Sequence, residues 1–436
     1  MKNNYYLNLK YILYCLLLLN ISLKAASLEE ALKKNIYNNP QVKVSIANYQ
    51  AAEHDLERVK AGERPSLDVS GELGRERTQI DYSFDGNREL NERQARVVGR
   101  YNLFEGYKTT HEIREKKSAL NVAKNQLLEK VNRSVSLMIQ VYIEVLRKKA
   151  LLEISENSYE NHLETLEKVK LRLKAGDGYE SNYRQTKARV KLAEGNMLLA
   201  KRTYMNAKIN YKRFLNVFPD TDRMKQPFVN FQIDESKTEE FIRKAYKRNY
   251  KLETQKAQVA VSQSLYEQTK SSDYPTLDLE VSQAWNNNVH GFTGADNSQK
   301  VALVLNYNLY NGGADQASKL SALKRSELEE NSLDDIKLNV EEQIRIAIMK
   351  YVMLEAQLEI TEAQLEQLLG TQTLYELEYQ NSKRTIIDLL NIKQEYSYAR
   401  AQKINTQFDQ LLTYYQFKSA MGELVDEFDL SDTLEL

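Results

Sequence analysis

The sequence predicts a mainly α-helical protein with a smaller amphipathic β part, in which one structural unit occurs twice. Two stretches without proline, residues 109–173 and 314–379, are long enough for helices of about 100 Å each. Short alternating stretches precede both of them, and the same landmarks recur roughly 206 to 210 residues later. With 15 glycines and 5 prolines in 436 residues, the chain has few residues that favour loops, so long uninterrupted elements are expected.

The N-terminus has the order of features typical of a secretory signal peptide. Basic residues precede the apolar run 11–19, and small residues follow it at Ala25. The run is too short for a membrane anchor, so we predict a signal peptide over residues 1–25, cleaved near Ala25. The chain's one cysteine, Cys15, lies inside this run, so the mature chain is expected to use neither disulfides nor thiol chemistry.

The internal repeat defines the expected organisation of the chain. Its paired landmarks are 64–68 with 274–278, 101–106 with 307–312, and 152–155 with 358–361. From them we predict a first repeat over 26–218, a connector over 219–237, a second repeat over 238–424 and an acidic tail over 425–436. Each repeat is expected to contain a helix, a β-hairpin, a long helix and a shorter helix.

The β part is predicted from alternating apolar and polar residues. After Pro65, the apolar residues Leu67, Val69 and Leu73 alternate with polar ones, which is the period of a strand. We predict β-hairpins over 65–103 and 275–309, with four strands of about eleven residues, the length of a tilted transmembrane strand. Alternation alone fits two hairpins of a soluble sheet equally well.

The helical part carries a coiled-coil-like pattern. In both long stretches, apolar residues recur at alternating spacings of four and three. These seams consist of Val131, Val135, Met138, Tyr142 and Val145, and of Leu354, Leu358, Leu365 and Leu368 with Thr361 between them. Four shorter helical stretches, 28–60, 179–216, 238–271 and 385–421, are about half as long, so pairs of them can stack to match one long helix.

Charge and motif content argue against several function classes. The chain has 61 basic and 61 acidic residues, which gives no basic surface for nucleic acid. Its mean hydropathy of -0.61 is too low for a helical membrane protein. The four histidines, His54, His111, His162 and His290, are far apart and none has a metal-ligand spacing. With no phosphate loop and no nucleophile elbow either, we expect no enzyme activity, no metal and no cofactor.

If the four strands enter a bilayer, physical constraints require an oligomer. A four-stranded sheet has two open edges whose backbone groups lipid cannot satisfy, so several chains must share one barrel. The exposed coiled-coil seams of an isolated chain favour the same oligomer. A secreted coiled-coil scaffold without a pore is an alternative, but it leaves four matched strands of membrane-spanning length unexplained.

The chain resembles the TolC-family outer membrane factors over essentially its whole mature length. The matching stretches are 28–32 with 38–40, the strand openings 65–67 and 275–277, the strand-to-helix turns 101–106 and 307–313, and the segment 379–391. The resemblance implies a homotrimer whose 12-stranded β-barrel continues into a 12-helix periplasmic α-barrel. It also implies a non-catalytic exit duct in the outer membrane of a Gram-negative bacterium, in contact with outer membrane lipid. A periplasmic adaptor and an inner-membrane ABC exporter or proton-driven pump are the implied partners.

Within the family, one set of motifs is most similar to the type I secretion branch. It comprises 174–178 through Gln185, followed by Arg189, with 145–147 and His162 upstream. This similarity implies that the duct conducts proteins. A multidrug or small-molecule efflux pump is the alternative.

The family resemblance also assigns site residues at the periplasmic end. It places two helix-hairpin tips for adaptor docking at Gly176, Asp177 and Gly178, and at Ser382 and Lys383. Without the resemblance, glycines flanking Asp177 simply predict a helix stop followed by a turn.

The acidic residues that ring the pore in other members correspond here to Asp388 and Asn391. Their spacing of three puts both on one helix face. A trimer would present three carboxylates where other members present six, and such a ring favours cations. The alternative is that Asp388 only helps to start the helix after Thr385.

The family's closed state is held by a gate latch, which maps onto Tyr379, Arg384, Asn182 and Ser181. Relatives carry an Asp at the position of Asn182. Because a neutral amide replaces that carboxylate, the resemblance implies a weaker latch to Arg384 than in typical members.

Overall fold

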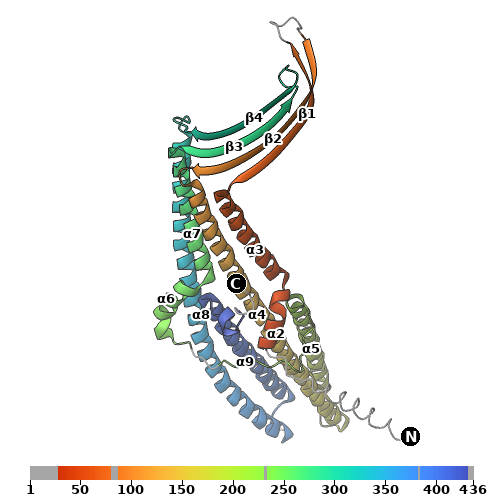
Figure 1. Cartoon of the computed structure of the whole chain (residues 1–436). Coiled ribbons are helices and arrows are strands. Elements are labelled where there is room, and N and C mark those ends of the chain that lie inside the picture. The colour runs from red at the N-terminus through yellow and green to blue at the C-terminus, as the bar shows by residue number, and fades with distance from the viewer. Residues whose placement is uncertain (1–27, 80–86, 230–232, 382, 431–436) are drawn as a thin grey trace, which may run out of the picture. The chain divides into compact units, whose positions relative to one another are not determined.

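The computed structural model describes residues 28–79, 87–229, 233–381 and 383–430 (Figure 1). The predicted signal peptide, Cys15 and Ser382 lie outside the described residues. The chain divides into two compact units. Of the described residues, unit 1 comprises those up to 43, those within 128–249 and those from 339 onward, and unit 2 comprises those within 44–127 and 250–338. Each unit therefore combines pieces of both predicted repeats, and the repeat boundaries remain a prediction.

Unit 2 contains one antiparallel sheet. Its strands are β1 (Ser66–Gln79), β2 (Asn87–Phe104), β3 (Thr276–Asn287) and β4 (Ala295–Asn306), in the spatial order β1-β2-β3-β4. β1 and β2 have 14 and 18 residues, so the expected length of about eleven is wrong for this hairpin. The reason is that residues 87–92 of β2 pair with β1 alone and extend the hairpin beyond β3, which ends at Asn287.

The two faces of the sheet differ in polarity. The register aligns Leu67, Gly99, Val281 and Val301 across all four strands on one face. This apolar face is exposed, with Leu73 at 82%. The other face is polar, and Glu280 forms salt bridges there to Arg96 (3.1 Å) and Arg100 (3.6 Å).

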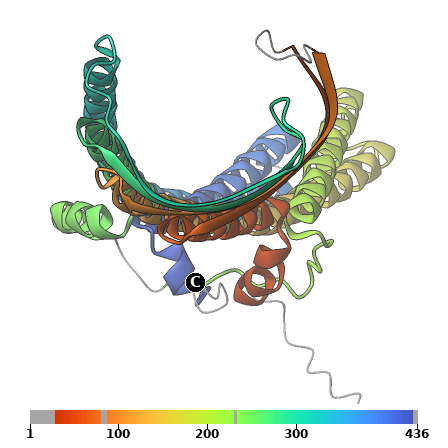
Figure 2. The ribbon, with the colours of Figure 1, turned by 45° about the horizontal axis from the view of Figure 1, so that its top comes forward.

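The sheet is curved and open. Figure 2 shows the curvature, and β1 and β4 each have a neighbouring strand on one side only within the described chain. Each of these edge strands therefore presents unpaired backbone N–H and C=O groups. The exposed apolar face indicates a surface that contacts lipid or another protein, and the open edges can pair with a further strand.

The helices follow the predicted order, with two corrections. They are α2 (Leu28–Asn35), α3 (Pro40–Lys60), α4 (Lys108–Lys174), α5 (Glu180–Leu215), α6 (Thr238–Arg248), α7 (Tyr250–Thr269), α8 (Ala314–Gln380), α9 (Ile386–Met421) and α10 (Leu424–Glu427). Short 3-10 turns lie at Ile36–Asn38, Ala61–Glu63, Glu235–Lys237 and Lys270–Asp273.

The stretches 28–60 and 238–271 were each expected to form one helix, and this is wrong because an asparagine interrupts each of them. Asn39 is extended, as the residue before Pro40 commonly is. Asn249 is also extended, and its side chain donates to the carbonyl of Ala420 (2.7 Å). Tertiary contacts thus decide the second break. Among the described helices, none is both long and apolar enough to cross a membrane.

Four helices lie side by side in unit 1, in the order α8, α9, α4, α5 (Figure 1). Lys393 and Lys403 of α9 bind Glu376 and Glu362 of α8 at 3.1 and 2.9 Å. Arg147 of α4 binds Asp409 of α9 at 2.9 Å. The ring of Tyr142 on α4 packs against that of Tyr211 on α5.

The five apolar residues of the α4 seam, from Val131 to Val145, are fully buried within the single chain. The expectation that an isolated chain leaves its seams exposed is therefore wrong for α4, because this seam packs inside unit 1. The seam of α8 is only half-buried, apart from Thr361, which is buried and donates to the carbonyl of Gln357 (2.7 Å). The two outer helices also expose a further apolar stripe each. α8 exposes Ile346, Met353, Ile360 and Leu374, and α5 exposes Leu198, Met205 and Ile209. These residues recur at multiples of seven, or at seven and four, which is the pattern of a helix-packing surface.

Two glycines of unit 1 provide a stability test. Gly422 ends α9 with φ +74°, and an added Cβ would lie 2.5 Å from the carbonyl oxygen of Arg248. We predict that Gly422→Ala lowers the free energy of unfolding by about 2 kcal/mol or more, because both backbone strain and a clash oppose it. Thermal or denaturant unfolding measures the change.

Gly370 is the matched control, since it lies within α8 with nothing within 4 Å of its added Cβ. Gly370→Ala is expected to stabilise the chain by about 0.5–1 kcal/mol. Equal effects of the two substitutions would contradict the described end of α9.

Candidate functional site

The hairpin tips of unit 1 are positioned by a small core shared by four helices. Val169 of α4 packs there with Ile386, Leu389, Leu390 and Ile392 of α9. Tyr183 of α5 and Leu368, Tyr375 and Tyr379 of α8 lie against this cluster. Because both hairpins contribute to it, the cluster fixes the two tips next to each other.

The first tip follows the end of α4. Gly176 has φ +81°, its N–H donates to Leu173, and the N–H of Asp177 donates to Arg172 (3.0 Å). These are the hydrogen bonds of a Schellman helix end. An added Cβ at Gly178 would lie 3.0 Å from the backbone of Leu173. The predicted helix stop and turn is therefore confirmed. Asp177 is exposed at the tip. The adaptor-docking role of this tip stays a prediction.

The second tip lies between α8 and α9. The N–H of Lys383 donates to the carbonyl of Glu378 (2.9 Å), and Lys383 is exposed. Thr385 is the N-cap of α9. Its hydroxyl accepts from the N–H of Asp388 (3.2 Å), and the Asp388 carboxylate accepts from the backbone N–H of Thr385 (3.4 Å), which completes a capping box. Asp388 thus has the helix-starting role that the sequence left open.

The second aperture residue, Asn391, contacts the other hairpin. Its side-chain oxygen accepts from the guanidinium of Arg189 on α5 at 3.2 Å. Asp388 and Asn391 lie one turn apart on α9, and Asn391 is exposed while Asp388 is half-buried. The aperture role of both residues is a prediction that concerns the oligomer.

The predicted latch residues are engaged within the chain by other partners. Arg384 binds Glu378 at 2.9 Å and stacks over the ring of Tyr375 at 4.1 Å. Within the described residues no hydrogen bond joins Arg384 to Asn182 or to Ser181. The hydrogen bond to Glu378 raises the pKa of Arg384.

Tyr379 is held by a residue that sequence reasoning missed. The guanidinium of Arg172 lies 4.4 Å from the ring centre of Tyr379 and donates to its carbonyl (3.4 Å). The internal repeat offered a signal for it. At the offset of 206, Arg172 corresponds to Glu378, so both tips carry a charged residue at matched positions. Arg172 contacts Tyr379, and Glu378 binds Arg384.

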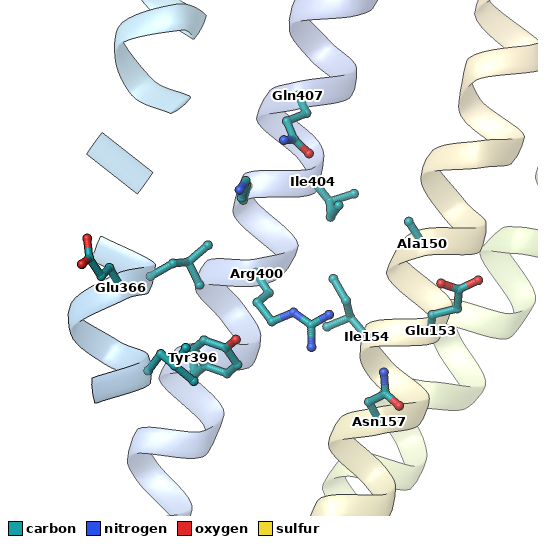
Figure 3. A pocket seen from close by; sticks show the side chains of 12 residues that line it. Ala150, Glu153, Ile154, Asn157, Glu366, Tyr396, Arg400, Ile404 and Gln407 are labelled. Carbon is teal, nitrogen blue, oxygen red and sulfur yellow. The ribbon is translucent and has the colours of Figure 1, made fainter. Parts of the chain in front are cut away.

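A hollow of about 610 Å³ lies between α4, α8 and α9, further along these helices from the tips (Figure 3). Glu153, Ile154 and Asn157 of α4 line one side, and Tyr396 and Arg400 of α9 line the other. Figure 3 shows Arg400 extending from α9 towards α4, close to Ile154. The lining mixes both charge signs with apolar groups, and no group of three metal-ligating side chains is found in the described part of the chain.

Comparison with known proteins gives one family. The family model described as outer membrane efflux protein matches residues 31–217 and 241–423. The chain belongs to the outer membrane efflux protein family. The predicted resemblance to TolC-family outer membrane factors is therefore confirmed. No curated protein sequence matches the chain.

Solved structures of similar fold are outer membrane channels. The Campylobacter jejuni channel CmeC is 14% identical with a TM-score of 0.80, over 91% of this chain and 85% of that one. The Vibrio cholerae protein VceC is 14% identical with a TM-score of 0.78, over 91% and 96%. The open state of the Neisseria gonorrhoeae channel MtrE is 12% identical with a TM-score of 0.77, over 91% and 88%.

Members of the outer membrane efflux protein family are non-enzymatic outer membrane channels that work with a periplasmic adaptor and an inner-membrane pump. This chain is accordingly a channel protein and no enzyme. The mainly helical fold with a small amphipathic sheet matches that of the family.

In this member, His162 of the long helix α4 is buried in surroundings that disfavour its protonated form. His162 of α4 is 2% exposed, and its Nδ1 lies 2.7 Å from the carbonyl oxygen of Ser158. Burial lowers the pKa of His162 below its usual 6.5, and the cations Lys393 and Arg189 lower this pKa further, against the opposing effect of Ser158.

Because the folded pKa is depressed, the unfolded chain binds the proton first as pH falls through about 6.5. The stability contributed by neutral His162 is therefore lost on the acid side. We predict that between about pH 7.5 and pH 5.5 the melting temperature of His162→Gln falls less than that of the wild type, by the equivalent of about 1 kcal/mol.

The control for this measurement is His54→Gln, since His54 is exposed on α3. It should keep the wild-type pH dependence. An equal acid-induced loss in wild type and His162→Gln would contradict the prediction.

Proposed function

We propose that three copies of this chain form one channel, in which three sheets close a 12-stranded β-barrel that continues into a 12-helix α-barrel. The single observation that carries the proposal is the open sheet with its exposed apolar face. In lipid, the edges of β1 and β4 need hydrogen-bonding partners, and β4 of one copy can pair with β1 of the next. The apolar face then meets hydrocarbon and the polar face lines the lumen.

The helices support the same closure. α8 and α5 are the outer members of the row of four, and both expose an apolar stripe, including Ile360 at 69% on α8. If α8 of one copy packs against α5 of the next, both stripes are covered and the ring of helices closes. Burying such side chains contributes roughly 1.5–3 kcal/mol each.

The paired tips would form the periplasmic end of the duct. Three copies of Asp388 would supply three carboxylates to the aperture, and Asn391 would add no charge. Arg384 has Glu378 as its partner instead of an acidic residue at position 182, which supports a weak latch. Rare and small openings of the isolated wild-type pore in bilayer recordings would contradict a weak latch.

For the cargo, we propose proteins exported by a type I secretion machine. The proposal rests on the similarity of these motifs to the type I secretion branch. Two of the motif residues join the two hairpins, since Arg147 binds Asp409 and Arg189 binds Asn391, and His162 is buried on α4. Efflux of small molecules is the second candidate, supported by the description of the matched family. A scaffold without a pore has no support left once the family is known.

Asp388 provides a test of the aperture. We predict that Asp388→Asn reduces the preference of the reconstituted pore for cations by about twofold or more. The reason is that the substitution removes one carboxylate per copy, three in all, from a narrow constriction. Reversal potentials in a salt gradient measure it. Unchanged selectivity would leave Asp388 with its capping role alone.

Two control variants separate charge from helix capping in this test. Thr385→Ala removes the capping hydroxyl but keeps the carboxylate, so it should cost about 1 kcal/mol of stability and keep selectivity. Asp177→Asn removes a tip carboxylate outside the aperture and should also keep selectivity.

The docking and cargo assignments share one experiment. Because Cys15 is the chain's one cysteine and lies in the predicted signal peptide, a single cysteine at Asp177 or Lys383 labels a tip selectively. We predict that crosslinking in living cells captures a periplasmic adaptor together with an ABC exporter. Capture with a proton-driven pump would assign efflux instead.

A cysteine at Lys350, exposed on α8 and roughly 45 Å along the helix from its end, is the control. It should capture no transporter complex. If tip cysteines capture no adaptor, or capture the same proteins as Lys350→Cys, the docking role is wrong.

A further inference from the structure

The β1–β2 hairpin continues beyond the rest of the sheet. Six residue pairs, from Gly74 with Glu92 to Gln79 with Asn87, join β1 and β2 where β3 no longer pairs with β2. At about 3.3 Å per residue, this extension adds nearly 20 Å of ladder. We refer to these pairs as the hairpin extension.

The apolar face of the sheet becomes basic at the start of the hairpin extension. Along β1, the face carries Leu67, Val69, Gly71 and Leu73, and then Arg75 and Arg77. On β2, Arg93 lies opposite Leu73 on the same face. The side chains of Arg75 and Arg77 are 72% and 70% exposed. Three arginines thus follow directly on an apolar surface, with Arg93 two residue pairs from Arg75 and four from Arg77.

On the neighbouring strand β3, a tryptophan independently marks the place where the apolar face ends. Trp285, the one tryptophan of the chain, lies on this face of β3 opposite Ala95, one row of pairs before Arg93. It is 47% exposed. Exposed tryptophans on membrane proteins concentrate where hydrocarbon meets headgroups. On β3 and β4 the face turns polar earlier, at Gln283 and Gln299, as expected for strands that cross a membrane at a tilt.

The arginines exceed the acidic groups beside them. Glu89 is the one carboxylate on this face of the described extension, and it binds Arg75 (2.5 Å) and approaches Arg77 (4.0 Å). Within the described residues no carboxylate lies in salt-bridge range of Arg93. Two positive charges therefore remain uncompensated on this face.

The opposite face of the hairpin extension differs. It carries Glu76 and Glu92, and its one arginine, Arg88, donates to the carbonyl of Gly291 (3.3 Å). The excess of positive charge is confined to the face that continues the apolar surface.

We propose that Arg75, Arg77 and Arg93 bind the phosphate groups of the glycolipid in the outer leaflet of the outer membrane. The inference rests on the proposed function, which places the apolar face in lipid and the helices on the periplasmic side. Because β1 follows α3 and β2 precedes α4, the hairpin extension is at the strand ends away from these helices, and this proposed orientation puts it on the cell exterior. Guanidinium groups are always charged and bind phosphate oxygens in pairs of hydrogen bonds. The site lies where the apolar face ends, so it meets the headgroups of lipids whose chains cover that face.

The test titrates purified wild-type oligomer in detergent with lipid A bearing two phosphates and, separately, with the same lipid after dephosphorylation, and counts bound lipid by native mass spectrometry. We expect the phosphorylated form to bind at least about tenfold more tightly, with a preference that weakens as salt is added. The variant Arg75→Gln/Arg77→Gln/Arg93→Gln should lose this preference.

The matched control is Arg88→Gln, which removes a positive charge from the opposite face of the same hairpin and should keep the preference. Equal binding of both lipids by the wild type, or a preference that survives the triple substitution, would overturn the proposal. So would displacement of the lipid by an equal concentration of inorganic phosphate, which would make this a site for free anions.

Channel conductance separates this inference from the proposed function. The triple variant should conduct like the wild type, because its substitutions lie on the face away from the lumen. Wild-type oligomers that conduct without preferring phosphorylated lipid A would overturn the lipid site and leave the channel intact, whereas a protein that washes off membranes without detergent would overturn the channel itself.

Discussion

Unpaired backbone groups at the two edges of the sheet are the constraint on which the structure depends. Lipid offers them no hydrogen bonds, and each unsatisfied group there costs several kcal/mol. β1 and β4 each lack a neighbour on one side in the described chain, and their apolar residues are exposed. A chain with this sheet can enter a membrane only by sharing its edges with other copies.

The helices also have apolar surfaces that other copies can cover, outside the lipid. The seam of α4 is fully buried within unit 1, so it stabilises the row of four helices in each copy. The stripes on α8 and α5 stay exposed, so they are available for contact between copies. At the tips, both hairpins contribute to one apolar cluster, and polar contacts such as Arg189 with Asn391 fix their register.

Periodicity in the sequence predicted most of the elements, because it reflects which face of each element is buried. It placed the two long helices within a residue or two of their observed ends. It missed the break at Asn249, whose cause is a hydrogen bond to Ala420 that local sequence does not contain. It also underestimated the lengths of β1 and β2, since Leu90 is the one apolar side chain larger than glycine in their outer pairs and gives no alternation of apolar with polar residues.

Side-chain partners were harder to predict than elements. The capping box of Thr385 and Asp388 follows from local spacing and was one of two stated alternatives. The partner of Arg384 was expected on the first repeat, yet Glu378, six residues away, binds it in the described chain. Arg172 and Tyr379 are distant in sequence, so only the fold shows that they meet.

The central claim is that the open sheet of one chain is completed by other copies. The most direct test is the mass of the complex extracted from outer membranes in mild detergent, measured by native mass spectrometry or light scattering with the detergent contribution removed. The account predicts three chains per complex that separate only on heating. A stable, detergent-soluble single chain with a folded sheet would contradict it.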